Sequence, residues 1–376
     1  MRGFLIMSDI FDYIIWRGDL TFEQAPLNCV DSLIFSQMAY FPFDDLWTEE
    51  ENGEITLAEA QKRLRHNLEQ GANPYFHMAK DRELFPAMAQ SRRFGGLKLR
   101  DYVNLIDLEQ EKQFSVVTVL LPVGAFIAYR GTDNTLVGWN EDLNMSFTTP
   151  VPAQIDAVAY FEKEAQLLEG AIWMGGHSKG GNLALYAAMF CEENLRKRIT
   201  GVYCNDSPGY DGTIVTKDHY QLLEGRLHSF VPQSSIVGMM FDHIEDYVVV
   251  HSRQVGPLQH DLYSWSVHGP DFVRLSAVKE SSVFWDKTLK EWMGRVEPAQ
   301  REAFVDAIFA ILGSTNANSF KEMRHDILKN SGIILKTVKN LDPETKKMVL
   351  DTMSLLLHSA QDQMPDFLPK VPWKKN

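Results

Sequence analysis

The stretch from Ala171 to Phe190 reads AIWMGGHSKGGNLALYAAMF, and it decides the fold class. Its first four residues are apolar and typical of a buried strand, whereas Asn182 to Phe190 is built of small and helix-favouring residues. The glycine-rich segment Gly175 to Gly181 joins them as a tight turn. A second strand candidate, Thr200 to Cys204, follows the helix. Strand, turn, helix and strand predict a βαβ unit, and therefore a parallel sheet in an α/β protein.

Further strands and a helix are expected on both sides of this unit. Ser115 to Leu121 and Ala125 to Tyr129 are short β-branched or aromatic runs separated by a Pro-Val-Gly turn, which predicts an antiparallel pair of strands. Apolar spacings of three and four predict a helix from Gln154 to Leu168. Later strand candidates, in chain order, are His228 to Val231, Tyr247 to His251 and Tyr263 to Val267.

The two ends of the chain have helical patterns instead. Helices are expected at Asn28 to Phe41 and Thr56 to Leu68, and then at Ala299 to Leu312, Ser319 to Thr337 and Asp342 to Leu357. We therefore expect a helical N-terminal region over 1–110, packed on an α/β catalytic core over 111–280. A helical C-terminal subdomain or cap is expected over 281–376.

Composition and charge exclude several classes of protein. The chain has 376 residues, of which 45% are hydrophobic and 23% charged, and this is ordinary globular usage. Its formal charge of -13 repels phosphate backbones and anionic headgroups. We therefore expect no nucleic-acid partner and no stable membrane insertion.

Cysteine usage and the N-terminus indicate the compartment. Cys29, Cys191 and Cys204 are widely spaced, match no metal pattern and cannot pair completely, so a disulfide framework is not expected. We find neither a signal peptide nor a run of about 18 uncharged apolar residues. These observations favour a cytoplasmic protein, and they leave the oligomeric state open.

Ser178 lies at the centre of the G-x-S-x-G pattern Gly176-His177-Ser178-Lys179-Gly180. A serine hydroxyl is a weak nucleophile unless the chain exposes it, places an imidazole against it and aims amide donors at the developing oxyanion. A sharp strand-to-helix turn, the nucleophile elbow, exposes the serine and crowds the positions two residues to either side, where this chain has glycine. The alternative is a glycine-rich turn with a merely exposed serine. A phosphate-binding loop is excluded because neither the P-loop nor the dinucleotide pattern is present.

A second segment, upstream of Ser178, adds to the pattern. Ala128-Tyr129-Arg130-Gly131-Thr132-Asp133 is followed by Gly138-Trp139-Asn140-Glu141-Asp142-Leu143. Together with GHSKG, these residues resemble the class 3, fungal-type lipases of the α/β-hydrolase superfamily, in a bacterial branch, over roughly residues 115 to 270. The resemblance implies an α/β-hydrolase fold with a mixed, mostly parallel central sheet. It also implies an oxyanion hole formed by Thr132 and the amide of Lys179, although Thr132 is alternatively a simple turn residue.

The resemblance further implies a late histidine. His260, in Gln259-His260-Asp261-Leu262-Tyr263-Ser264-Trp265, resembles the family's histidine and lies downstream of the serine, as the chain order of the fold requires. We expect His260 to act as the general base. His268 is the rival, and a purely structural histidine is the alternative.

The third catalytic residue, an acid that orients the histidine, departs from the family pattern. This chain has Ser235 where the resembling lipases have an aspartate. Asp206 follows the strand after the Ser178 unit, so it is expected at the carboxyl edge of the sheet, where catalytic groups gather. There it would hold His260 in the correct tautomer. A turn aspartate is the alternative, and Asp242 and Asp246 are rival acids.

These residues together predict a serine hydrolase that cleaves a carboxylic ester, as an esterase or lipase does, through an acyl-enzyme on Ser178. The substrate is expected to be a small-molecule or lipid ester. The alternatives are a non-catalytic binding relative, and a thioesterase or peptidase that uses the same residues. Asp133, Glu141 and Asp142 have no matching histidine cluster, so neither a metal nor another cofactor is expected.

Overall fold

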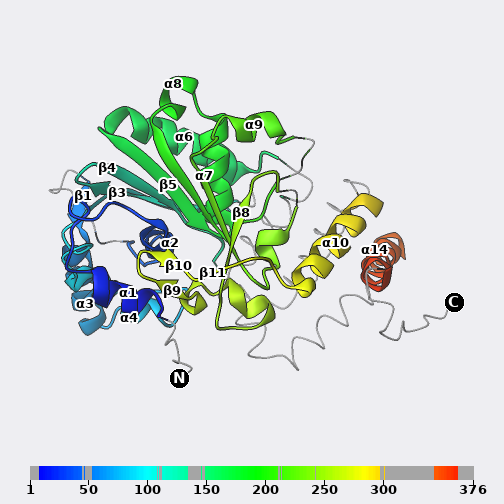
Figure 1. Ribbon diagram of the computed structural model, residues 1–376, viewed down its shortest axis with the longest axis horizontal. Helices are drawn as coiled ribbons and strands as arrows, with labels where there is room; N and C mark the ends of the chain where they lie inside the picture. The colour runs from blue at the N-terminus through cyan, green and yellow to red at the C-terminus, as the bar shows by residue number, and fades with distance from the viewer. Residues whose placement is uncertain are drawn as a thin grey trace.

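The computed structural model describes residues 8–44, 46, 53–107, 109, 112–133, 145, 149–210, 212, 214–241, 243–296, 300 and 343–362. Within them the chain forms a nine-stranded mixed sheet with helices on both faces (Figure 1). The protein is therefore of the α/β class. The helices expected at Ala299 to Leu312 and Ser319 to Thr337 lie outside the described residues.

The strands of the large sheet lie in the order β1-β2-β3-β4-β5-β6-β7-β8-β11. Each neighbouring pair from β4 to β8 is parallel, whereas β1, β2, β3 and β11 join antiparallel. A separate short ladder pairs β9 with β10. The strands are β1 (Glu54–Thr56), β2 (Lys98–Asp107), β3 (Lys112–Leu121), β4 (Gly124–Tyr129), β5 (Ala171–His177), β6 (Ile199–Asn205), β7 (Leu227–Pro232), β8 (Tyr247–Val250), β9 (Val267–His268), β10 (Asp271–Phe272) and β11 (Arg274–Leu275).

Several expected elements are confirmed and others are corrected. The antiparallel β3 and β4 pair and the parallel β5-α7-β6 unit are both present. The sheet begins earlier than expected, however, because β1 and β2 lie in the region that was predicted to be helical. A register shift between Arg100 and Val103 interrupts the alternation of β2 and hides it from pattern analysis. The strand expected at Tyr263 to Val267 is not formed: Tyr263 and Ser264 lie in the 3-10 helix η4 (Leu262–Ser264), Trp265 forms an isolated bridge, and Val267 alone belongs to a strand.

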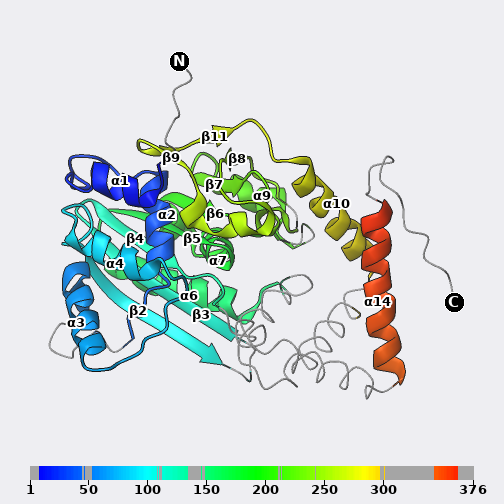
Figure 2. The same cartoon turned by 90° about the horizontal axis from the view of Figure 1, so that it is seen from below.

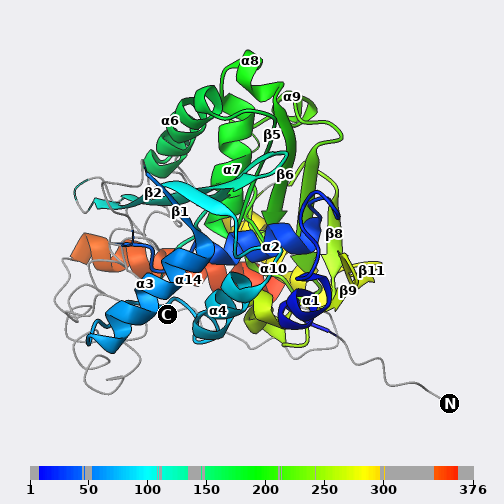
Figure 3. The same cartoon turned by 90° about the vertical axis from the view of Figure 1, so that its left-hand side faces the viewer.

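One face of the sheet is covered by α6 (Pro152–Leu167) and α7 (Lys179–Phe190) (Figure 3). Along β4, Ala125, Ile127 and Tyr129 are buried in the core on this side, whereas Phe126 and Ala128 are buried on the opposite side. A strand with both faces buried reads as a continuous apolar run, which explains the sequence of β4. The short helices α8 (Glu193–Arg196) and α9 (Lys217–Gln221) follow β5-α7 and β6, respectively.

The N-terminal helices cover the other face. They are α1 (Ile10–Arg17), α2 (Cys29–Met38), α3 (Leu57–Glu69) and α4 (Asp81–Gln90). The side chain of Asn28 caps α2 and that of Thr56 caps α3, so both helices begin where the sequence predicts. Nearly every residue of α2 is buried, because this helix packs on β4, β5 and β6.

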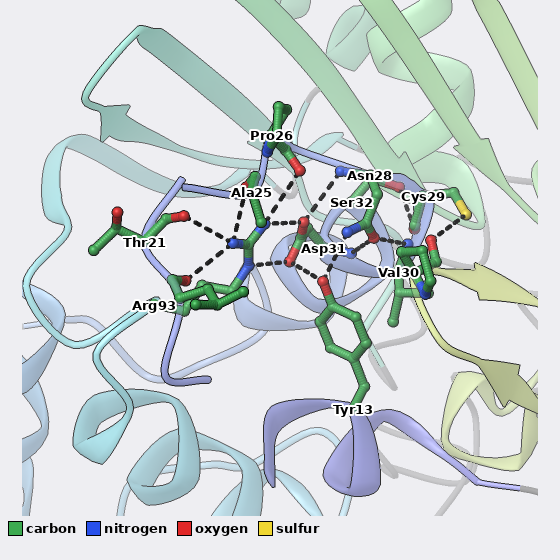
Figure 4. Close-up of polar contacts among 12 residues, drawn as sticks. Tyr13, Thr21, Ala25, Pro26, Asn28, Cys29, Val30, Asp31, Ser32 and Arg93 are labelled. Atoms are coloured by element: carbon green, nitrogen blue, oxygen red, sulfur yellow. Dashed lines mark hydrogen bonds and ion pairs between the residues drawn. The ribbon is translucent and has the colours of Figure 1, made fainter. Parts of the chain in front are cut away.

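A buried ion pair ties the N-terminal helices together (Figure 4). Arg93 Nη2 lies 2.6 Å from Asp31 Oδ2, and both side chains are completely buried. Arg93 also donates to the carbonyl oxygen of Ala25 at 3.0 Å, and the Tyr13 hydroxyl donates to Asp31 Oδ1 at 2.9 Å. The pair therefore connects α1, α2 and the turn after α4 through satisfied polar groups.

Two long helices at the C-terminal end lie on the opposite side of the molecule from α1 and α3 (Figure 2). They are α10 (Glu280–Arg295) and α14 (Pro343–Asp362), and they pack against each other. The Trp292 Nε1 group donates to the Thr352 carbonyl oxygen at 3.2 Å. No helix in the described part of the chain combines the length and apolar character needed to cross a membrane.

Candidate active site

Ser178 lies in a strained turn between β5 and α7. Strand β5 ends at His177, helix α7 begins at Lys179, and Ser178 has φ 58° and ψ -133°. A non-glycine residue in a sparsely populated conformation costs about 1–3 kcal/mol, and such strain concentrates at functional sites. The Ser178 amide donates to the Asn205 carbonyl oxygen of β6 at 3.0 Å, which fixes the turn on the neighbouring strand.

Close packing explains the glycines that flank Ser178. A Cβ atom added to Gly176 would lie 2.5 Å from the Tyr129 carbonyl oxygen, and one added to Gly180 would lie 2.2 Å from the same oxygen. Gly131 is equally constrained, because its Cβ would lie 2.5 Å from the His177 carbonyl oxygen and 3.2 Å from Ser178 Cβ. The end of β4 and the loop after it therefore press directly against the Ser178 turn.

His260 and Asp206 are in direct contact. His260 ends the 3-10 helix η3 (Gly256–His260), and its Nδ1 lies 2.7 Å from Asp206 Oδ2. Asp206 is completely buried just after β6, with φ 49°. Its other oxygen, Oδ1, accepts from Ser235 Oγ at 2.5 Å and from the Gly238 amide at 3.1 Å. The carboxylate is therefore held on both sides, and Nε2 is the imidazole nitrogen that faces away from it.

Ser178 and His260 line one pocket of about 220 Å³, together with Thr132 and Lys179. Much of its remaining wall is apolar, formed by Met145, Pro208, Val237, Met240 and Phe241. Thr132 lies in the loop after β4, whereas Lys179 is the first residue of α7. Backbone N–H groups in the first turn of a helix lack intrahelical acceptors and lie at the positive end of its dipole. The pocket thus brings a hydroxyl, an imidazole and suitable amide donors to one edge of the sheet.

Two further histidines surround His260. His177 Nε2 lies 2.8 Å from the His260 carbonyl oxygen, and since a carbonyl only accepts, Nε2 must carry the proton. Burial lowers the pKa of His177 well below its ordinary value, and it lowers the pKa of His77 to about 4. Both imidazoles are therefore neutral at pH 7. The His77 ring stacks on Tyr40 with ring centroids 4.5 Å apart.

The rival residues lie elsewhere or outside the described residues. His268 is exposed on β9 and does not line this pocket. Asp246 is exposed just before β8. Asp242 and the segment Gly138 to Leu143 lie outside the described residues. In the described part of the chain, no three His, Cys, Asp or Glu side chains form a group suited to a metal ion.

The N-terminal region contributes to this pocket, which the sequence patterns do not predict. Tyr40 and His77 both line the pocket of Ser178, yet they come from a region that we interpreted as packing helices. Their local signal is weak. Tyr40 directly follows the apolar pattern of α2, and His77 lies in the aromatic loop Pro74-Tyr75-Phe76-His77 between α3 and α4.

A family model, Mbeg1-like, matches residues 88–310, which is well over half of the 376 residues. The chain belongs to the Mbeg1-like family. This family is linked to lipase-like proteins, and the mixed sheet fits a lipase-like α/β fold. The Mbeg1-like region contains Ser178, Asp206 and His260, whereas Tyr40 and His77 precede it. The curated proteins contain no match to this chain.

Proposed function

We propose that this Mbeg1-like protein is a serine hydrolase of the α/β-hydrolase fold that cleaves a carboxylic ester through an acyl-enzyme on Ser178. The observation that carries the proposal is the 2.7 Å contact between His260 Nδ1 and Asp206 Oδ2, beside a strained serine in the same pocket. Each group required for acyl transfer has a candidate here: a nucleophile, a base, an orienting acid and amide donors.

The proposed reaction begins when Ser178 Oγ attacks the ester carbonyl carbon and His260 Nε2 accepts its proton. The buried Asp206 carboxylate stabilises the imidazolium, and the amides near Thr132 and Lys179 hold the oxyanion. The C–O bond then breaks, and the alcohol leaves with the proton from His260. Water, deprotonated by His260, then attacks the acyl-enzyme; the bond to Ser178 Oγ breaks, His260 returns the proton to that oxygen, and the carboxylic acid leaves.

The resemblance to class 3 lipases, in a bacterial branch, supports this assignment and defines its unusual feature. In those lipases the acid stands at the position of Ser235, after β7. In this chain Ser235 donates to Asp206 instead, and Asp206 follows β6. We therefore propose that the acid comes from the adjacent strand, with Ser235 as its hydrogen-bond donor.

Replacement of Ser178 tests the proposal directly. Ser178→Ala should lower kcat/KM on a short-chain aryl ester by roughly a thousandfold or more, because all covalent chemistry is lost. The exposed Ser276 provides a matched control, since Ser276→Ala should leave the rate unchanged. A loss of less than tenfold in Ser178→Ala would remove Ser178 from the mechanism.

A fluorophosphonate probe separates this proposal from the non-catalytic alternative. The folded protein should be labelled, and Ser178→Ala should not be. Failure to label Ser178 in the folded protein would favour a binding role. Thioester and peptide substrates, tested alongside the ester, separate the other two alternatives.

A further inference from the structure

A second groove of about 500 Å³ adjoins the pocket of Ser178 and shares Tyr40, His77 and Asp133 with it. Its walls come from segments that are far apart in the sequence: the segment after α2, helix α3, the loop before α4, strand β2 and the loop after β4. A substrate whose reacting carbonyl lies at Ser178 can therefore extend in two directions. One leads to the apolar wall of the first pocket, and the other leads into this groove.

The groove differs from the pocket in its chemistry. Three tyrosines and three asparagines line it: Tyr40, Tyr75, Tyr102, Asn67, Asn73 and Asn104. Side-chain amides both donate and accept hydrogen bonds, and aromatic rings offer flat apolar faces. A ligand that carries many hydroxyl groups on a carbon skeleton matches both kinds of side chain. A plain hydrocarbon chain would cover these polar side chains without offering them a hydrogen-bond partner.

Arg130 gives an independent indication of a ligand oxygen. Its side chain lines the groove and is nine-tenths buried, yet its Nε and Nη2 atoms have no hydrogen-bond partner within the described part of the chain. The nearby Asp133 Oδ2 is 3.8 Å from Nη2, which is too far for a hydrogen bond. Buried donors without acceptors destabilise the folded protein. An oxygen acceptor beside Arg130 would remove that cost.

The charges in the groove decide which oxygen-bearing group fits. Asp44 and Asp133 line it beside the single guanidinium of Arg130, while His77 is neutral at pH 7 because burial lowers its pKa to about 4. The two carboxylates disfavour a phosphate or carboxylate group. A quaternary ammonium suits the negative charge, but it offers no acceptor to Arg130. Hydroxyl groups accept from Arg130 and donate to the carboxylates at once.

We propose that this groove binds the alcohol part of the ester, and that this alcohol is a neutral polyhydroxylated ring such as a sugar. The inference rests on the proposed ester hydrolysis at Ser178 and names its substrate class. The Asp44 carboxylate is already oriented for this role by Tyr102 Oη at 3.3 Å and Asn104 Nδ2 at 2.9 Å.

Four octanoyl esters that differ only in their alcohol test the inference on the full-length protein. The alcohols are ethanol, glucose, choline and glycerol 3-phosphate, and the readout is kcat/KM. The glucose ester should exceed the ethyl ester by about tenfold, the effect of one good interaction of about 1.4 kcal/mol, and it should rank above the two charged esters. A first rank for any other ester overturns the inference while leaving the hydrolase intact. No hydrolysis of any ester, together with no fluorophosphonate labelling, overturns both proposals.

Two substitutions locate the effect in the groove. Arg130→Lys keeps the charge but replaces the forked guanidinium, and Tyr75→Ala removes a ring that is 54% exposed and can be lost without opening the core. Each should reduce the ratio of glucose to ethyl ester activity by about fivefold to tenfold, the effect of one lost hydrogen bond or stacking contact. Trp16→Ala, which removes a ring of similar exposure on α1, should leave the ratio unchanged. An unchanged ratio in Tyr75→Ala, with an unchanged melting temperature, would show that the groove does not bind the alcohol.

Discussion

Ser178, Asp206 and Phe241 have positive φ angles of 58°, 49° and 65°. Ser178 and Phe241 line the same pocket, and Asp206 contacts His260, which lines it as well. Backbone strain persists only where the surrounding structure determines the conformation, as the Asn205 and Gly238 hydrogen bonds do here. At the scale of single residues, three of the four non-glycine positions with positive φ in the described part of the chain therefore lie at or beside the candidate site, and the fourth, Asp101, lies in β2.

Replacement of the proposed acid is the first prediction at this scale. Asp206→Asn should lower kcat by about a thousandfold to ten-thousandfold, because an amide neither stabilises the imidazolium nor fixes the correct tautomer. The measurement is steady-state hydrolysis of an aryl ester. Asp246→Asn, at an exposed position, serves as the control and should retain full activity. Full activity in Asp206→Asn, combined with its loss in Asp242→Asn, would place the acid elsewhere.

Ser235 gives a second, milder prediction. Ser235→Ala removes the hydroxyl that donates to Asp206 Oδ1 and leaves a buried carboxylate with one donor fewer. The cost of about 1–3 kcal/mol corresponds to a fall in kcat of roughly fivefold to a hundredfold. Ser235→Thr keeps the hydroxyl and should restore much of the rate. Equal activity in the alanine variant and the parent protein would separate Ser235 from the acid.

At the scale of elements, the ion pair between Asp31 and Arg93 should stabilise the N-terminal helices. Arg93→Met leaves Asp31 as an unpaired buried charge, so the free energy of unfolding should fall by about 3–5 kcal/mol. Urea unfolding, followed by circular dichroism, provides the measurement. Arg65→Met on α3 breaks only the exposed pair with Glu69 and should cost less than about 1 kcal/mol. Similar losses in both variants would contradict a special role for the buried pair.

The apolar wall of the Ser178 pocket predicts an acyl-chain preference. A volume of about 220 Å³ holds roughly seven groups of the size of a water molecule, at ~30 Å³ each, and a methylene group is similar in size. Hydrolysis of an ester series should therefore peak at medium chains and decline towards palmitoyl. Phe241→Ala enlarges the pocket and should shift the optimum to longer chains. An optimum that stays in place would show that Phe241 does not limit the chain.

The sequence predicts local elements far better than their spatial neighbours. The run AIWM, the glycine turn and the small-residue helix are determined by contiguous residues, so the β5-α7-β6 unit can be recognised directly. Strand β2 cannot be recognised in this way, because Asp101, with a φ of 48°, interrupts its alternation of inward and outward residues. The participation of Tyr40 and His77 depends on α2 packing against the sheet, which is a long-range contact that no local pattern records.

At the scale of the whole molecule, the neutral histidines predict sensitivity to acid. The unfolded chain protonates His77 near pH 6.5, its ordinary pKa, whereas the folded protein does so only near the lowered pKa of about 4. Stability is therefore lost as the pH falls from about 6.5 to 4, by at most about 1.4 kcal/mol per pH unit for each group. The lowered pKa of His177 acts in the same direction.

Asp81 opposes this trend, because burial raises its pKa to about 6. As the pH falls, the folded protein therefore binds a proton at Asp81 before the unfolded chain does, and this stabilises the folded state. Asp81 is present in both the parent protein and a His77 variant, so its contribution cancels when the two are compared. His77→Gln should lose less stability than the parent protein between pH 7 and pH 5, as measured by urea unfolding at both values. Identical losses would show that His77 is not a source of acid sensitivity.

The sheet has two buried faces, and this has a practical consequence for expression of the protein. Val117 and Phe126 are completely shielded by the helices that precede residue 88, the start of the family match. A fragment that spans only 88–310 would turn those side chains towards water and should aggregate. The region that matches the family is therefore shorter than the region that the chain needs in order to fold. Protein made for crystallisation or screening should retain the residues before residue 88.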